Sequence, residues 1–123
     1  MTMRTAQEIF DTVSKHLLTQ NKRSEGVHVI LGLENHICAY RSVDGLKCAI
    51  GCLIPDEQYI PEMESLRIGG IVRKNWLSPE LEQEFIQNIN LISDLQIVHD
   101  FFTPEYWAEQ LDRVRRQFNL SLI

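Results

Sequence analysis

The 123-residue sequence lacks several features that would assign it to a class at once. No apolar run reaches the length of a membrane-spanning helix, and the first ten residues, MTMRTAQEIF, hold no apolar signal core. Basic residues are few, since twelve Lys and Arg stand against seventeen Asp and Glu and the net charge is −5. These absences argue against a membrane protein and against broad, charge-driven binding of DNA or RNA. We therefore expect a cytoplasmic protein.

Cysteine is also scarce, and its spacing matches no known site. Cys38, Cys48 and Cys52 contain no C-x-x-C pair, and with His36 they would make four candidate metal ligands at a spacing that no zinc site is known to use. A disulfide between Cys48 and Cys52 is disfavoured, because four residues along one strand span about 13 Å. A catalytic thiolate needs a neighbouring base, such as His36 or His99. We favour buried, unreactive thiols over these alternatives, and we expect neither a metal nor a cofactor.

The patterns that are present predict one domain, residues 1–123, with helices at both ends. Thr5 and Glu8 form a capping box at the start of a helix from about Ala6 to Gln20. Two further helices open at the similar motifs Ser78–Glu80 and Thr103–Glu105, where Pro follows an N-capping residue. Apolar residues at helical spacing extend each helix. The predicted core comprises Ile9, Phe10, Val13, Leu17, Cys48, Ile50, Phe85, Ile89, Ile92, Trp107, Leu111 and Phe118.

The middle of the chain predicts β-structure. Asp44-Gly45 is a strong signal for a two-residue hairpin turn, and that turn would place Arg41 opposite Cys48 in strands that end before Pro55. The β-branched run Val27–Leu33 predicts a further strand, which would turn at residues 32–35 and pair with residues 36–41. We therefore expect an α+β fold, in which a small antiparallel sheet of two or three strands packs against the N-terminal helix and two C-terminal helices.

Basic and aromatic residues around the hairpin and around Gly69-Gly70 suggest a site for an anion. Arg side chains contact phosphate in a bidentate manner, and aromatic rings stack on bases. The glycines could form a mobile anion-binding loop, although an exposed connector is the simpler interpretation. The candidate ligand-binding residues are Tyr40, Arg41, Lys47, Arg67, Arg73, Lys74, Trp76 and His99.

His99-Asp100 superficially resembles the metal-binding pair of HD phosphohydrolases, but a metal site needs further ligands from other helices. The histidine also continues the apolar stripe of the preceding helix. We favour a partly buried histidine that is hydrogen-bonded by a neighbour such as Asp100 or a backbone carbonyl.

Two blocks of the chain carry a resemblance to a known family. CAYRSVDGLKCAIGCLIPDEQY, at residues 38–59, and LISDLQIVHDFFTPEYWAEQLDRV, at residues 91–114, resemble small uncharacterised proteins of phage, prophage and bacterial genomes. Those proteins share a CAYR…DGLKCA-GCLIPDE-Y block, a later LQ-VHD segment and a W-x3-L helix. The resemblance covers most of the chain, but residues 27–35 are more apolar than the family's loop, as a partner-specific insert would be. It implies an accessory role, such as counter-defence or modulation of a host protein, and no catalytic residues.

The sequence thus predicts a binding protein of the bacterial host cytosol rather than an enzyme. It would sequester a small anionic, nucleotide-like ligand or occupy a host protein. The alternative is a small cytosolic enzyme with a cysteine nucleophile or a His99–Asp100 metal site. A protein-binding role predicts an exposed apolar patch at residues 27–33 or 120–123, and it makes self-association an additional expectation.

Overall fold

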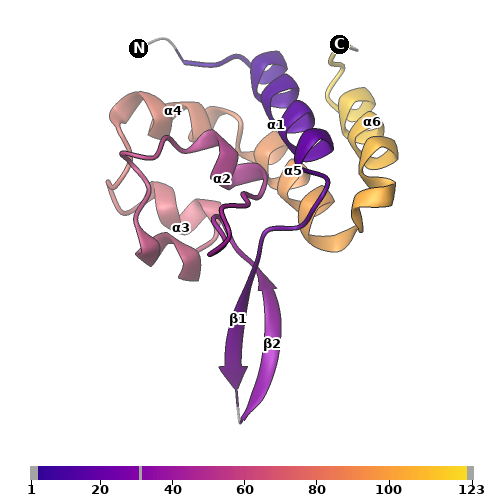
Figure 1. The fold of residues 1–123 in the computed structure, drawn as a ribbon. Coiled ribbons are helices and arrows are strands. Elements are labelled where there is room, and N and C mark those ends of the chain that lie inside the picture. Colours follow the sequence, from indigo (N-terminus) through magenta and orange to yellow (C-terminus); the bar gives the residue numbers. More distant parts are fainter. Residues whose placement is uncertain (1–2, 31, 122–123) are drawn as a thin grey trace.

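The computed structural model describes residues 3–30 and 32–121, and most of its regular structure is helical (Figure 1). The strands β1 and β2 pair with each other, and no third strand joins them among these residues. The elements in chain order are α1 (Ala6–Gln20), β1 (Glu25–Ile30), β2 (Leu33–Cys38), α2 (Ala49–Leu53), the 3-10 helix η1 (Pro61–Ser65), α3 (Ile68–Val72), α4 (Pro79–Gln87), α5 (Ile89–Phe101), the 3-10 helix η2 (Pro104–Tyr106) and α6 (Trp107–Gln117).

The helix boundaries follow the capping residues. Thr5 accepts a hydrogen bond from the Glu8 amide and Glu8 accepts one from the Thr5 amide, so the predicted capping box and the helix Ala6–Gln20 are confirmed. Ser78 caps α4, as predicted, by accepting from the Leu81 amide. The helix predicted after Ser78 is nevertheless interrupted at Asn88, where the backbone leaves the helical region and the side chain donates to the Glu84 carbonyl.

The core lies between the helices. α1 contacts α2, α5 and α6, and the fully buried side chains include Trp107, Phe85 and Ile9. Ten of the twelve predicted core residues are buried, and the other two, Ile89 and Phe118, are partly buried against the same cluster. Among the described residues, no helix combines the length and the apolar character needed to cross a bilayer.

The prediction of a sheet packed against the helices is wrong, because helices alone form the body of the protein. A hairpin does form from the β-branched run, with Ile30 opposite Leu33 and Glu25 opposite Cys38. It does not lie beneath the helices, however; it projects from one end of the helical body (Figure 1). The predicted α+β arrangement is therefore replaced by a helical domain with a protruding two-stranded hairpin.

The second predicted hairpin, at Asp44-Gly45, is reduced to one bridge between Arg41 and Lys47. Gly45 has a φ of 88°, and the Ser42 amide donates to the Leu46 carbonyl across a three-residue loop instead of a two-residue one. The register is shifted by one residue from the prediction. The predicted strand then becomes α2, because Cys48 caps a helix by accepting from the Gly51 amide through Sγ.

Candidate functional site

A buried hydrogen-bond network connects the base of the hairpin to α5. The amide of Ser24, just before β1, donates to His99 Nε2 at 2.9 Å, and the Ser24 carbonyl accepts from the Ala39 amide just after β2. The Ser24 hydroxyl donates to the Leu46 carbonyl at 3.1 Å. Both ends of the hairpin are therefore held by the body, although the hairpin itself protrudes.

His99 is neutral in this arrangement. Its Nε2 accepts a hydrogen bond and therefore carries no proton, so its single proton lies on Nδ1 and is donated to Asp100 Oδ1 at 2.8 Å. The ring is fully buried and stacks on Trp107 with 5.6 Å between the ring centres. Asp100 also accepts from Gln96 Nε2 at 2.7 Å. His99 is thus bonded to Asp100, one of the two partners that the sequence suggested, but it is fully rather than partly buried.

Cys38 joins His99 and Asp100 in a group whose ligand atoms lie within 4.8 Å of one another. Such a donor set matches zinc in chemistry. In the geometry present, however, the Nε2 lone pair of His99 accepts from Ser24 and Nδ1 carries the proton. A metal on Nδ1 would move that proton to Nε2, where it would face the Ser24 N–H. The group is therefore a structural hydrogen-bond network rather than a metal site.

The three cysteines are unreactive by their surroundings. Burial, reinforced by a hydrogen bond to Asp100, raises the pKa of the Cys38 thiol to about 12. Burial likewise raises the pKa of Cys52 to about 12 and raises that of Cys48. All three are free thiols, and because the thiolate is the nucleophile, none has the activation that a catalytic cysteine requires.

We expect slow thiol labelling of the folded protein. At pH 8, each of the three cysteines should react roughly a hundredfold more slowly than free cysteine, because the raised pKa values suppress the thiolate. Mass spectrometry of iodoacetamide-treated protein checks this, with urea-unfolded protein as the fully reactive control. Fast, selective labelling of one native cysteine would reopen the cysteine-enzyme alternative.

The predicted anion-binding residues do not assemble into one site. Arg41 and Lys47 do converge, but on Asp56, whose carboxylate lies 2.6 Å from Arg41 and 3.6 Å from Lys47. The hydrogen bond and charge of Arg41, with the charge of Lys47, lower the pKa of Asp56. Arg41 also stacks on Tyr59 at 4.7 Å. Both cations therefore already contact a carboxylate within the protein, and Asp56 offsets one of their two positive charges.

The other candidates lie in separate places. Arg73 and Lys74 lie at the end of α3, and Arg73 is exposed. The Lys74 Nζ atom lies 5.9 Å from the centre of the Trp76 ring. The predicted glycine loop is part of the short helix α3. Arg67 is exposed; its carbonyl accepts from the Gly70 and Ile71 amides, but its side chain makes no hydrogen bond or ion pair with another described residue. Tyr40 is buried, and its hydroxyl donates to the Leu66 carbonyl.

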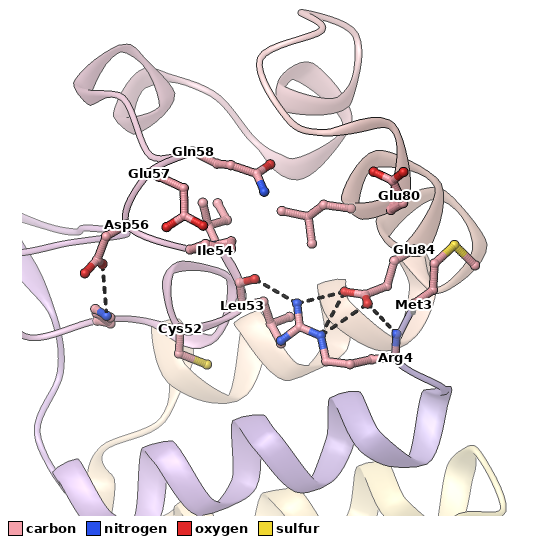
Figure 2. Close-up of a pocket in the computed structure, with 13 residues that line it drawn as sticks. Met3, Arg4, Cys52, Leu53, Ile54, Asp56, Glu57, Gln58, Glu80 and Glu84 are labelled. Carbon is pink, nitrogen blue, oxygen red and sulfur yellow. Dashed lines mark hydrogen bonds and ion pairs between the residues drawn. The ribbon is translucent and has the colours of Figure 1, made fainter. Parts of the chain in front are cut away.

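One hollow, which we name the Arg4 hollow, has a volume of about 540 Å³ and lies between α2 and α4 (Figure 2). The Arg4 guanidinium binds Glu84 at 2.9–3.2 Å and the Leu53 carbonyl at 2.8 Å. Glu57 and Glu80 add exposed carboxylates to the lining. Because its arginine is fully paired and its rim is acidic, the Arg4 hollow does not suit an anion.

A second hollow, the Tyr40 hollow, has a volume of about 490 Å³ and lies beside the hairpin base, between α3 and α5. Its carboxylates are occupied: Glu64 accepts from the Tyr40 and Arg41 amides and from the Tyr59 hydroxyl, and Asp100 belongs to the His99 network. The remaining lining is mainly apolar. The hollow can therefore accept an apolar group without leaving a buried carboxylate unpaired.

Two exposed apolar residues of α5, Ile97 and Phe101, border the Tyr40 hollow and are 41% and 76% exposed. The sequence interpretation missed both. They are four residues apart and lie opposite the buried stripe of Ile92, Leu95 and His99, so helical spacing alone could have identified an apolar pair facing outward. Arg67 lines the same hollow and is the one predicted ligand-binding residue there that is both exposed and unpaired within the described part of the chain.

Comparisons with known proteins add no relative. No family model matches this chain, and neither a curated protein nor a solved structure shows significant similarity to it. The site must therefore be interpreted from its own geometry.

Proposed function

We propose that this protein is a non-enzymatic binding protein that occupies a protein partner through the Tyr40 hollow. The observation that carries the proposal is the pairing of a preformed, mainly apolar hollow with the exposed side chains of Ile97 and Phe101. Exposed aromatic residues beside a pocket are common anchors of protein interfaces. The unpaired Arg67 favours a partner segment with an acidic group next to its apolar anchor.

Sequestration of a small anionic ligand is less well supported. That role needs several cations directed at one cavity. Arg41 and Lys47 instead both contact the Asp56 carboxylate, and Arg73 and Lys74 line neither the Arg4 hollow nor the Tyr40 hollow. The protein-partner form of the binding role therefore accounts better for the arrangement of charges.

The enzyme alternative is also less well supported, because neither the cysteine thiols nor His99 is free to act. Its thiols have raised pKa values, and both ring nitrogens of His99 are engaged in hydrogen bonds. The resemblance to phage-type accessory proteins suggests where the partner would be found. We place the partner in a bacterial host cell, where occupying it would counter a defence system or modulate a host protein.

Photo-crosslinking tests this function directly. With the light-activated analogue p-benzoylphenylalanine at position 101, the protein should crosslink to one specific protein in a bacterial lysate, because the exposed ring lies at the proposed interface. The substitution Phe101→Asp should abolish capture of the same protein by the tagged chain, since an apolar anchor is replaced by a charge.

The matched control is Ile86 on α4, which is 47% exposed and lines neither hollow. The analogue at position 86 should not crosslink to that protein, and Ile86→Asp should leave capture unchanged. Equal capture by wild type and by Phe101→Asp would refute the Tyr40 hollow as the interface.

A further inference from the structure

The hairpin has two unpaired edges, and its register shows which backbone groups they offer. Glu25 pairs with Cys38, and the Ala39 amide donates to the Ser24 carbonyl just outside that pair. In an antiparallel ladder, hydrogen-bonded and non-hydrogen-bonded pairs alternate. Because Ser24 and Ala39 form a hydrogen-bonded pair, the next pair, Glu25 and Cys38, is a non-hydrogen-bonded one. The N–H groups of Val27 and Val29 therefore point outward from β1, and those of Glu34 and His36 point outward from β2.

We propose that two copies of this chain pair through the outer edges of β2 and form a continuous four-stranded sheet. The strands run antiparallel about a two-fold axis at Asn35. Glu34 of each copy then lies opposite His36 of the other, with their outward N–H and C=O groups hydrogen-bonded, and Leu33 lies opposite Ile37. This assembly is independent of the Tyr40 hollow.

The choice of β2 over β1 rests on residue complementarity. Pairing about Asn35 places an acidic residue opposite a histidine and an apolar residue opposite an apolar one, and both combinations stabilise cross-strand pairs. Self-pairing of β1 about Val27 places Glu25 opposite Val29, and self-pairing about His28 places two histidines opposite each other. Only the β2 edge is complementary to itself in both charge and hydropathy.

The surrounding structure also favours association. A two-stranded hairpin in water is marginally stable by itself, and an open strand edge with unpaired N–H and C=O groups readily pairs with another strand. The Ser24–His99 and Ala39–Ser24 hydrogen bonds already hold the hairpin base, so little further ordering is needed there. Because the hairpin projects from the body (Figure 1), antiparallel pairing places the two bodies at opposite ends of the sheet.

A disulfide experiment tests the axis. In the proposed sheet, position 35 meets its own copy in a non-hydrogen-bonded pair, where the Cα atoms are about 4.5 Å apart and a disulfide can form. Asn35→Cys should therefore give a covalent dimer under mild oxidation. His28→Cys, which changes the cross-strand neighbour of Asn35 on β1, is the matched control and should remain monomeric on non-reducing gels.

Proline variants test the edge itself. His36→Pro removes an outward N–H of β2. Val27 lies opposite His36 on β1, so Val27→Pro removes an outward N–H at the same level of the hairpin and serves as the matched control. By analytical ultracentrifugation, His36→Pro should raise the dimer dissociation constant roughly a hundredfold, because the two-fold axis removes two hydrogen bonds at once. Val27→Pro should leave that constant nearly unchanged.

Three results would overturn the proposal. The wild-type chain could remain monomeric up to roughly 500 µM, where a weak dimer would still be populated. His28→Cys could crosslink as readily as Asn35→Cys. The dimer could also form without any Asn35→Cys crosslink, which would exclude the proposed register.

Discussion

Replacing Gly51 with alanine should destabilise the protein strongly, because the added methyl group has no room. An alanine Cβ at position 51 would lie 1.9 Å from the Tyr40 carbonyl oxygen and 2.8 Å from its carbonyl carbon. That backbone has little freedom to move, because the Tyr40 amide is bound to Glu64 and its carbonyl accepts from the Cys48 amide. We expect the free energy of unfolding to fall by about 3 kcal/mol or more.

Thermal denaturation followed by circular dichroism checks this expectation, and a loss of about 3 kcal/mol corresponds to a melting temperature lower by roughly 10 °C. Gly69→Ala is the matched control, because its added Cβ would meet no atom within 4 Å in the helix α3. That control should be neutral or more stable by about 0.5 kcal/mol. Equal stability of Gly51→Ala and wild type would show that α2 does not pack closely against the Tyr40 backbone.

Replacing Arg4 with methionine is expected to have a similarly large effect. Glu84 is nearly buried, with a side chain only 4% exposed, and Arg4 supplies its compensating charge through contacts of 2.9–3.2 Å. Without the guanidinium, the carboxylate retains the Arg4 amide as its main partner, at 2.6 Å. Removing one member of a buried ion pair typically costs about 3–5 kcal/mol, and because Arg4 is partly exposed we expect about 3 kcal/mol.

Urea denaturation measures this change, and a double variant separates the charge from the packing. Arg4→Met combined with Glu84→Met should recover most of the lost stability, because it removes the uncompensated charge and fills the space with apolar atoms. Arg116→Met is a control at the exposed ion pair with Asp112, and it should leave the urea midpoint nearly unchanged. If Arg4→Met were as mild as Arg116→Met, Glu84 would not depend on the ion pair.

The helical parts of the fold were predictable from local signals. The Thr5–Glu8 capping box marks the start of α1, and Ser78 marks the start of α4. Helical apolar spacing identified eight of the ten predicted core residues that are buried, whereas Cys48 and Ile50 were expected on a strand. These signals work because capping and helical periodicity involve residues within one or two turns of each other.

Residues 48–53 show why the predicted sheet failed. Ile50 and Cys52 alternate with small residues as in a strand, yet this segment is the helix α2. Its position depends on the close approach of Gly51 to the Tyr40 backbone and on the hydrogen bond from the Ile50 amide to Gln96. These contacts join residues that are distant in the chain, so the local pattern could not reveal them.

Parts of the candidate site were likewise predictable from the sequence, and other parts were not. The sequence pointed to His99 as a partly buried histidine bonded by Asp100 or a backbone carbonyl, and the structure gives Asp100. It also singled out Tyr40 and Arg67, which line the Tyr40 hollow. It also grouped Arg41 and Lys47 with Arg73 and Lys74, because the first pair flanks the predicted hairpin turn and the second follows Gly69-Gly70. Folding separates these cations, since Asp56 binds the first pair while the second pair lies at the end of α3.

The sequence by itself determined where α1 and α4 begin, most of the buried residues, and the β-branched run that forms the hairpin. Each of these follows from interactions between residues near one another in the chain. Only the tertiary structure decided that the hairpin protrudes from a helical body, that Ser24 donates to His99, and that Ile97 and Phe101 border a hollow. Those features depend on contacts across as many as 75 residues, which long-range packing selects and local preference does not specify.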